Sequence, residues 1–88
     1  MRKDVKGDAL KRLAYIQGHL EGVRRMVEEE KYCVDILRQL FAVRRALDQV
    51  GLRVLDGHLH TCVVQGIRDA RQEEVLKELL ELFALKTR

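Results

Sequence analysis

The sequence predicts an all-α protein, and three observations support this prediction. The chain has 88 residues and no proline, so no residue is barred from a helix interior. Aromatic residues make up 5% of the chain and charged residues 35%, a balance that favours helices with aliphatic cores. Apolar residues recur at three- and four-residue spacings along most of the chain. A chain this small buries little apolar surface alone, so we expect one domain, residues 1–88, stabilised by subunit partners.

Three helices are predicted. The first runs from about residue 8 to 30 and carries a single apolar stripe. The second runs from about 32 to 67, is apolar on more than one side and would extend roughly 50 Å. Gly51 and Gly57 could instead break it into a hairpin, but no cluster of turn-forming residues surrounds either glycine. The third runs from about 72 to 86, with acidic residues in its first turn and basic residues at its end.

The second helix predicts the mode of assembly. Neither companion helix is long enough to cover its apolar surface, so we expect a homo-oligomer in which this helix is the main shared element. Three helices per chain with a long central one indicate an antiparallel helical dimer, or a dimer of such dimers.

Three residues carry the candidate chemistry. His58 and Cys62 lie four residues apart, so they share a helix face one turn apart, whereas His60 points elsewhere. Alone, this pair could equally be a core histidine and a buried thiol. Cys33 precedes His58 by 25 residues, about 37 Å along a straight helix, so the two cannot coordinate the same metal ion within one chain. In an antiparallel dimer, however, Cys33 of one subunit meets His58 and Cys62 of the other.

The ligand set favours copper(I). Two thiolates and one imidazole are soft donors that suit trigonal copper(I), whereas zinc usually requires a fourth ligand and none is obvious. These grounds favour copper(I) over zinc, nickel or cobalt without deciding the matter. We expect one copper(I) per protomer at the intersubunit site, with zinc as a possible surrogate.

Charge and hydropathy indicate the compartment and a partner. The formal net charge is +3, and residues 1–25 carry seven basic side chains against three acidic ones. This excess suits a polyanion such as DNA, although a solvated helix face would look the same. No signal peptide and no membrane-length apolar run is visible, so we expect a cytoplasmic protein with free thiols, no membrane partner and no small-molecule substrate.

The chain also resembles a known family over residues 12–63, and more loosely over the third helix. The segments that carry the likeness are Gly18-His19-Leu20-Glu21-Gly22, Arg25-Met26-Val27-Glu28, Tyr32-Cys33-Val34-Asp35-Ile36-Leu37, Gln39-Leu40, Ala42-Val43 and Leu55-Asp56-Gly57-His58-Leu59-His60-Thr61-Cys62-Val63. They resemble the copper-sensitive operon repressors, a family that also contains nickel/cobalt, formaldehyde and persulfide sensors. The resemblance implies an antiparallel four-helix-bundle dimer, two of which form a flat tetramer. It also implies that the ligand-free form binds operator DNA and that ligand binding lowers its affinity for that DNA.

Departures from the other branches point to the copper branch. Nickel/cobalt sensors carry histidine at the position of Cys62 and another near the amino terminus, and neither is present. Formaldehyde sensors use an amino-terminal proline, which this chain lacks, and persulfide sensors have cysteine at the position of His58. The resemblance further implies that Tyr32 and Glu78 form hydrogen bonds with the other ring nitrogen of the ligand histidine. Glu78 could otherwise be a solvated helix residue.

The resemblance implies DNA contact through a flat basic surface without a recognition helix. Arg12 matches an arginine that the family uses for DNA, and Gln49 stands where some members have a basic residue. The predicted DNA-contacting residues are Arg12, Lys11, Lys6, Arg44, Arg45 and Arg53.

The sequence thus predicts a copper(I)-responsive repressor whose release from DNA permits expression of copper efflux and handling genes. The alternatives are a cytosolic copper(I) buffer or carrier that binds no DNA, and a sensor of another ligand in the same family. We expect no enzymatic activity, because a His58–Cys62 dyad has no third orienting group, oxyanion donor or substrate pocket in the sequence.

Overall fold

A computed structural model describes residues 1–86. Its elements are α1 (Lys3–Glu28), α2 (Cys33–His58), a π-helical turn (Leu59–Val63), α3 (Val64–Arg68) and α4 (Gln72–Lys86). Residues 1–86 contain no strand, and the all-α prediction is confirmed.

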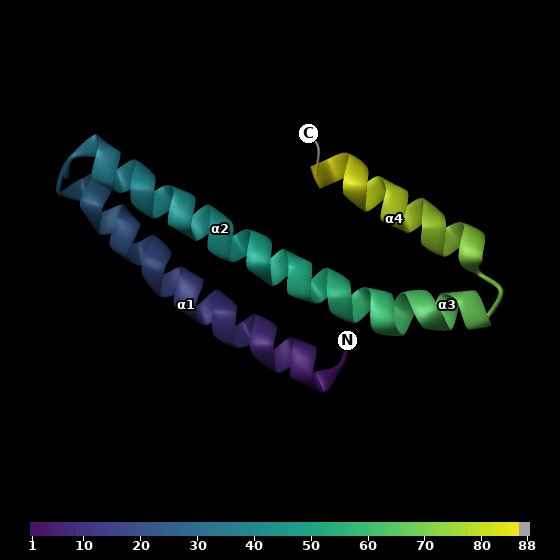
Figure 1. Ribbon diagram of the computed structural model, residues 1–88. Helices are drawn as coiled ribbons and strands as arrows, with labels where there is room; N and C mark the ends of the chain where they lie inside the picture. The colour runs from purple at the N-terminus through teal and green to yellow at the C-terminus, as the bar shows by residue number, and fades with distance from the viewer. Residues whose placement is uncertain (87–88) are drawn as a thin grey trace.

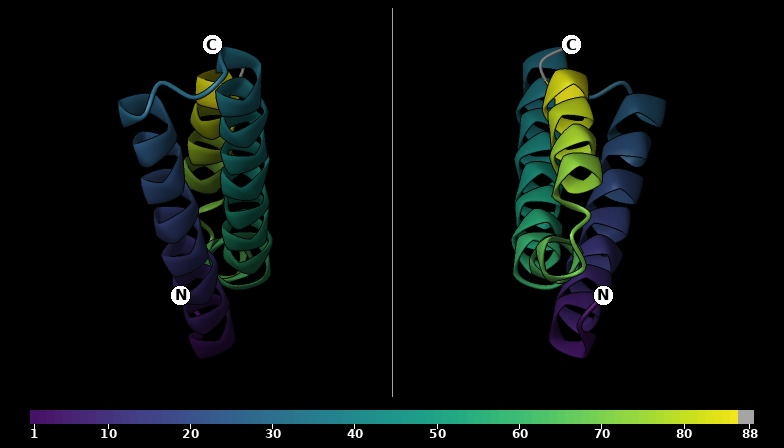
Figure 2. Two further views of the ribbon diagram at one scale, coloured as in Figure 1. Left: turned by 90° about the vertical axis from the view of Figure 1, so that its left-hand side faces the viewer. Right: turned by 90° about the vertical axis from the view of Figure 1, so that its right-hand side faces the viewer.

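The helices form an open, elongated arrangement. α1 and α2 lie side by side and antiparallel, and α4 folds back along the other side of α2 (Figure 1). The side views in Figure 2 show the axes of the three long helices roughly aligned, with α1 and α2 splayed apart at one end. The chain measures 55 × 29 × 14 Å, so it is about one helix thick in its shortest dimension.

The first helix starts earlier than the predicted residue 8. It begins at Lys3, with Asp4 in the first turn where the helix dipole favours an acidic residue. Val5 packs against Gly57 of α2, so closely that a Cβ on Gly57 would lie 2.9 Å from a Val5 methyl group. This contact packs the extra turn of α1 onto α2.

The first helix also ends earlier than the predicted residue 30. Glu30 adopts a φ of 53°, and the N–H group of Lys31 donates to the carbonyl of Met26 at 2.9 Å. The N–H of Glu30 donates to the carbonyl of Val27 at 3.0 Å. This pattern is a Schellman motif, which terminates a helix at its left-handed residue, here a glutamate instead of the usual glycine.

The central helix continues through both of the glycines at which it could have broken. α2, the π turn and α3 follow one another from Cys33 to Arg68 without an intervening loop. The chain then turns at Ala70, which has a φ of 56°, and α4 begins. Buried Val75 of α4 contacts Gly66 of α3 in space that a side chain on Gly66 would occupy, and this close contact seats α4 against α3.

The core of a single chain is small. Its main cluster is the seam between α1 and α2, made by Ala9, Ile16, Val23, Val43 and Val50. The accessible surface is 7370 Å², whereas a compact monomer of 10.3 kDa exposes about 5400 Å². The radius of gyration is 17.3 Å, against about 12 Å for a compact chain of 88 residues. A single chain therefore exposes more surface than a compact monomer, and large hydrophobic side chains such as Leu47 and Phe41 are part of it. None of the described helices is long and apolar enough to cross a membrane.

Candidate metal centre and nucleic-acid interface

His58 and Cys62 lie together at one end of a groove between α2 and α4. His58 is the last residue of α2 and is half-buried, and Cys62 lies in the π turn that follows and is exposed. The groove has a volume of about 640 Å³. Its apolar walls include Leu47 and Leu55 from α2, and Leu79, Leu82 and Phe83 from α4.

The π turn has its own side-chain hydrogen bonds. The Thr61 hydroxyl donates to the carbonyl of Gly57 at 2.8 Å and lies 3.7 Å from the sulfur of Cys62. The Nδ1 atom of His60 lies 2.8 Å from the carbonyl of Asp56, which directs His60 away from Cys62 and leaves it exposed. Side-chain donors of this kind supplement the backbone bonds where a helix changes its spacing, and π turns are frequent at functional sites.

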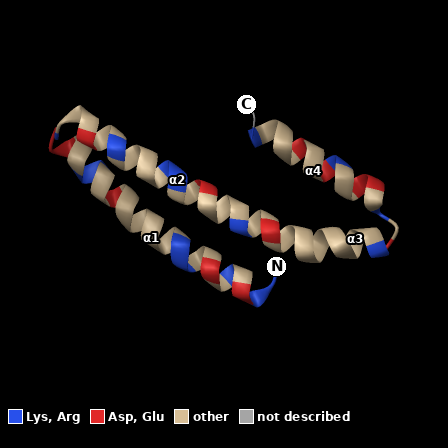
Figure 3. Ribbon diagram, in the orientation of Figure 1, with Lys and Arg blue, Asp and Glu red and all other residues tan. Residues whose placement is uncertain are grey.

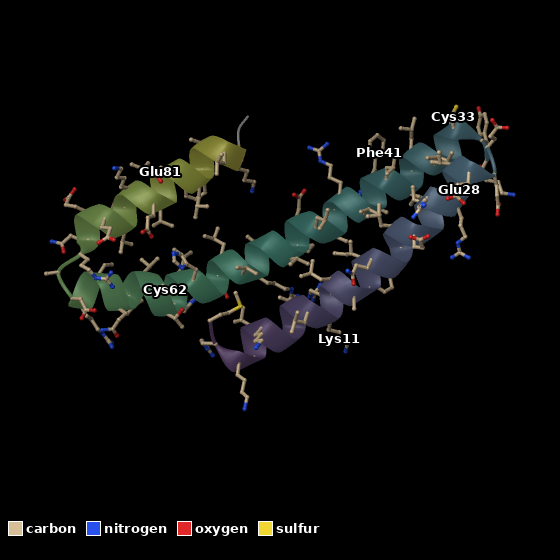
Figure 4. All side chains as sticks on the ribbon, turned by 180° about the vertical axis from the view of Figure 1, so that it is seen from behind. Lys11, Glu28, Cys33, Phe41, Cys62 and Glu81 are labelled. Carbon is tan, nitrogen blue, oxygen red and sulfur yellow. The ribbon has the colours of Figure 1, made fainter. Side chains whose placement is uncertain are left out.

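Cys33 lies at the opposite end of α2. It is the first residue of that helix and is exposed, and Figure 4 shows it beside the turn from α1, far from Cys62. Because α2 is unbroken, the 25 residues to His58 span about 37 Å. Within residues 1–86 no three ligand-type side chains gather closely enough to hold a metal ion. One chain therefore presents two of the predicted ligands together and the third separately.

The three predicted ligands nevertheless share one helix face. We call it the α2 stripe, and its members follow one another in steps of three or four residues: Cys33, Leu37, Leu40, Arg44, Leu47, Gly51, Leu55, His58 and Cys62. Val43 and Val50, which pack on α1, lie on a neighbouring face. Leu37, Leu40 and Leu47 are 38% to 48% exposed, so the middle of the stripe is apolar and uncovered in a single chain.

Neither Tyr32 nor Glu78 forms a hydrogen bond with His58 within one chain. Tyr32 precedes Cys33 at the far end of α2 and is 67% exposed. Glu78 is exposed on α4 and does not line the groove. Within the described residues, the His58 side chain forms no hydrogen bond, so its second ring nitrogen is open to a partner. The role predicted for these two residues stays a prediction.

The basic residues predicted to contact DNA lie on α1 and α2, interleaved with acidic ones (Figure 3). Arg12 donates to both carboxylate oxygens of Asp8, at 3.1 and 3.2 Å, and Arg53 of α2 lies 3.7 Å from the same carboxylate. Asp8 thus brings two predicted DNA-contacting arginines from different helices together. Lys6 and Lys11 are exposed, and Lys11 points away from α2 in Figure 4.

Arg44 and Arg45 are both exposed but lie on different faces. They are separated by about 100° around the helix axis, so Arg44 belongs to the α2 stripe and Arg45 does not. From the sequence, both are predicted to contact DNA as an exposed pair. In the structure they belong to different faces, because only Arg44 shares a face with Leu40 and Leu47.

Some residues of the site were not identified from the sequence. The four-residue spacing of Asp8 and Arg12 is a detectable signal for their ion pair, but the approach of Arg53 requires the packing of α1 on α2. Likewise, nothing in the spacing of Leu79, Leu82 and Phe83 indicates that they face His58 across a groove.

Comparison with known proteins shows the family to which the chain belongs. A family model described as metal-sensitive transcriptional repressor matches residues 5–84. The chain is 41% identical over 78 residues to the copper-sensing transcriptional repressor CsoR of Bacillus subtilis (strain 168), covering 89% of this chain and 77% of that protein.

Two solved structures are also similar. The crystal structure of the copper-sensing repressor CsoR with Cu(I) from Geobacillus thermodenitrificans NG80-2 aligns with a TM-score of 0.94 and 38% identity, covering 100% of this chain and 92% of that one. The nickel-responsive transcriptional regulator InrS aligns with a TM-score of 0.76 and 37% identity, covering 89% and 88%. With the family model spanning residues 5–84, the chain belongs to the metal-sensitive transcriptional repressors.

Proposed function

We propose that this repressor senses copper(I), holding operator DNA in its metal-free form and releasing it when copper(I) binds. The observation that carries the proposal is the α2 stripe, which has one thiol at its first position and an imidazole and a second thiol at its other end. The copper-sensing relatives and the similar structure solved with Cu(I) support the choice of metal. Release would permit expression of genes for copper efflux and handling.

The donor set fits copper(I). Cys33 and Cys62 offer soft thiolates, His58 offers a borderline imidazole, and three such ligands satisfy copper(I) but leave zinc a ligand short. Cys62 and Cys33 are free thiols, and the groove beside His58 is apolar. One copper(I) per protomer would be coordinated by residues of both subunits and would thereby link them. Zinc could occupy the site only as a surrogate.

The proposed site requires a second copy of the chain on the α2 stripe. Antiparallel pairing of two α2 helices places Cys33 of each subunit beside His58 and Cys62 of the other. The accessible surface exceeds that of a compact monomer by about 2000 Å², which is enough for a stable interface. We propose this dimer as the sensing unit and a dimer of dimers as the complete repressor.

Tyr32 and Glu78 would then act through the ligand histidine. Tyr32 adjoins Cys33, so dimerisation carries it with Cys33 toward His58 of the other subunit. A hydrogen bond donated by the other ring N–H of His58 to the Glu78 carboxylate or to the Tyr32 hydroxyl oxygen would fix the tautomer of His58. Glu78 would link that bond to the position of α4.

DNA contact is proposed for the exposed basic residues of α1 and α2. Arg12, Arg53, Lys6, Lys11 and Arg45 would contact phosphates across a flat surface, with part of the specificity coming from DNA shape. Because a repressor must have access to operator DNA, we propose that the protein is cytoplasmic.

Copper(I) titrated into operator-bound protein is expected to release the DNA after about one equivalent per protomer, as measured by fluorescence anisotropy of a labelled operator. Zinc(II) at the same concentration serves as the control and should release less. A protein that binds copper(I) but never shifts its own promoter fragment would instead be a copper buffer, and release by another metal alone would identify a different sensor.

Arg12→Ala is expected to weaken operator binding similarly for specific and unrelated DNA, because a phosphate contact carries no sequence information. The slope of log affinity against log salt concentration should fall by about one for each Arg12 that touches DNA. Arg24→Ala is a matched control, because Arg24 is also an exposed arginine of α1 paired with an acid four residues away. An unchanged salt slope for Arg12→Ala would remove Arg12 from the interface.

A further inference from the structure

We propose that Arg44 of each subunit forms an ion pair with Asp48 of the other, and that these two ion pairs select the antiparallel orientation of the dimer. The inference rests on the proposed function, because the occupant of the α2 stripe is a second copy of this chain. It assigns Arg44 to the subunit interface, and not to the DNA surface.

The first observation is that neither residue has a charged partner among residues 1–86. Arg44 and Asp48 are one helical turn apart, a spacing at which opposite charges often pair. The pairs Arg12–Asp8 and Arg24–Glu28 have this spacing and do form, with distances of 3.1 and 3.2 Å. Within residues 1–86 no ion pair joins Arg44 to Asp48 or either of them to another residue.

The second observation is their position. Arg44 lies on the α2 stripe between Leu40 and Leu47, and Asp48 lines the groove that contains His58 and Cys62. Both charges therefore border the surface that a second subunit would cover. A charge placed there without a partner would oppose association, since it would lose water without gaining an ion pair.

The third observation is a match of spacings along the stripe. An antiparallel pairing that places Cys33 opposite Cys62 of the partner also places Leu37 opposite His58 and Leu40 opposite Leu55. In the same register Arg44 lies opposite Gly51, and the two helices cross between Leu47 and Asp48. Each pair in this list joins two members of the stripe, so a single two-fold axis accounts for all of them.

Gly51 supplies the space that the arginine needs. A Cβ atom built on Gly51 has no neighbouring atom within 4 Å. Arg44 of the partner subunit can therefore lie across this glycine. Asp48 is three residues from Gly51, about 4.5 Å along the axis, within reach of a guanidinium group.

The charges distinguish this arrangement from others that would bury similar apolar surface. Parallel pairing about the same stripe brings Arg44 beside its own copy and Asp48 beside its own copy, so both contacts are repulsive. A slide by one turn in one direction separates Arg44 from Asp48, whereas a slide in the other direction brings them closer together. Either slide moves Cys33 away from Cys62, so the ion pairs select the antiparallel orientation and the ligand positions select the register. Charged residues at the border of an apolar seam select partner orientation in coiled coils by the same means.

The experiment uses two full-length variants, Arg44→Asp and Asp48→Arg, whose masses differ. Each variant alone presents like charges across its interface, and we expect its self-association to weaken by about tenfold or more. When mixed in equal amounts, the two should form heterodimers, because every intersubunit contact then joins opposite charges. Native mass spectrometry is expected to show predominantly heterodimer, and copper(I) titration should restore one equivalent per chain.

Pairing within a chain gives a different result. Each variant carries like charges one turn apart whether it is mixed or alone, so intrachain pairing predicts homodimers and heterodimers in the statistical 1:2:1 proportion. That proportion would overturn the inference. Arg38→Asp is the matched control, because Arg38 is an exposed arginine on another face of α2, and the same charge change there should leave association unaffected.

Two further measurements separate the possible failures. The double variant with both reversals in one chain should regain wild-type self-association, and circular dichroism of each variant checks that its helices form. Statistical mixing by variants that still bind copper(I) would reject the ion pair while the proposed sensing function stands. A wild-type chain that neither dimerises nor binds copper(I) would reject both.

Discussion

Equal amounts of a Cys33→Ala chain and a Cys62→Ala chain, unfolded and refolded together, are expected to regain copper(I) binding that neither chain has alone. Alone, each chain lacks one thiolate at every site. Losing a residue that only hydrogen-bonds a ligand typically lowers metal affinity by about 10–100-fold, so losing a ligand itself should lower the copper(I) affinity by more than that. In a mixed dimer, one site takes Cys33 from one chain and His58 and Cys62 from the other and is complete. The second site of that dimer has no thiol at all.

Random assortment makes half of the dimers mixed, so the mixture should bind about one quarter of the wild-type copper(I) equivalents with wild-type affinity. Titration against a copper(I) chelator measures both quantities. His60→Ala is the control and should leave binding unchanged, because His60 is bonded to Asp56 and turned away from Cys62. If the mixture binds no better than its components, the intersubunit site is wrong.

Leu47→Glu is expected to dissociate the dimer and, with it, to abolish tight copper(I) binding. Leu47 is 48% exposed in the single chain and lies next to the expected crossing point of the two α2 helices. The substitution places two carboxylates near each other in an apolar seam, where an unpaired charge is strongly unfavourable. We expect dimer dissociation to become easier by about 100-fold or more, as measured by analytical ultracentrifugation.

The control for this variant is Leu80→Glu. Leu80 is 71% exposed on α4 and does not line the groove, so its replacement should change neither association nor copper(I) binding. A Leu47→Glu protein that remains dimeric with its copper(I) affinity intact would show that the α2 stripe is not the interface. Its helical content at low concentration tests whether the monomer folds at all.

Much of the fold follows from local chemistry that the sequence displays. The acidic start and basic end of α4 give its bounds, and the lack of turn-forming residues around Gly51 and Gly57 predicts an unbroken α2. The early start of α1 and its end at Glu28 were harder to predict from the sequence. The first depends on the contact of Val5 with a glycine on another helix, and the second on a left-handed glutamate where glycine is usual.

The site was predictable in its residue types but less so in its surroundings. The spacing of His58 and Cys62 places them one turn apart, and the distance to Cys33 demands a second subunit. The π turn at Cys62 has no such signal, because its side-chain bonds use ordinary threonine and histidine donors. The step of about 100° between neighbouring helical residues already separates Arg44 from Arg45, but which of the two faces stays open depends on how α1 and α4 pack on α2.

The shortest dimension of the chain, 14 Å, has a consequence for sensing in a cell. A single layer of helices cannot enclose a metal ion, so under the proposed function folding, association and metal capture become one linked equilibrium. Any condition that raises the number of chains also raises the apparent affinity for copper(I), by mass action on the dimer. The abundance of the repressor would then set the copper(I) level at which transcription begins, and a change in its own expression would retune the response without any change in its ligands.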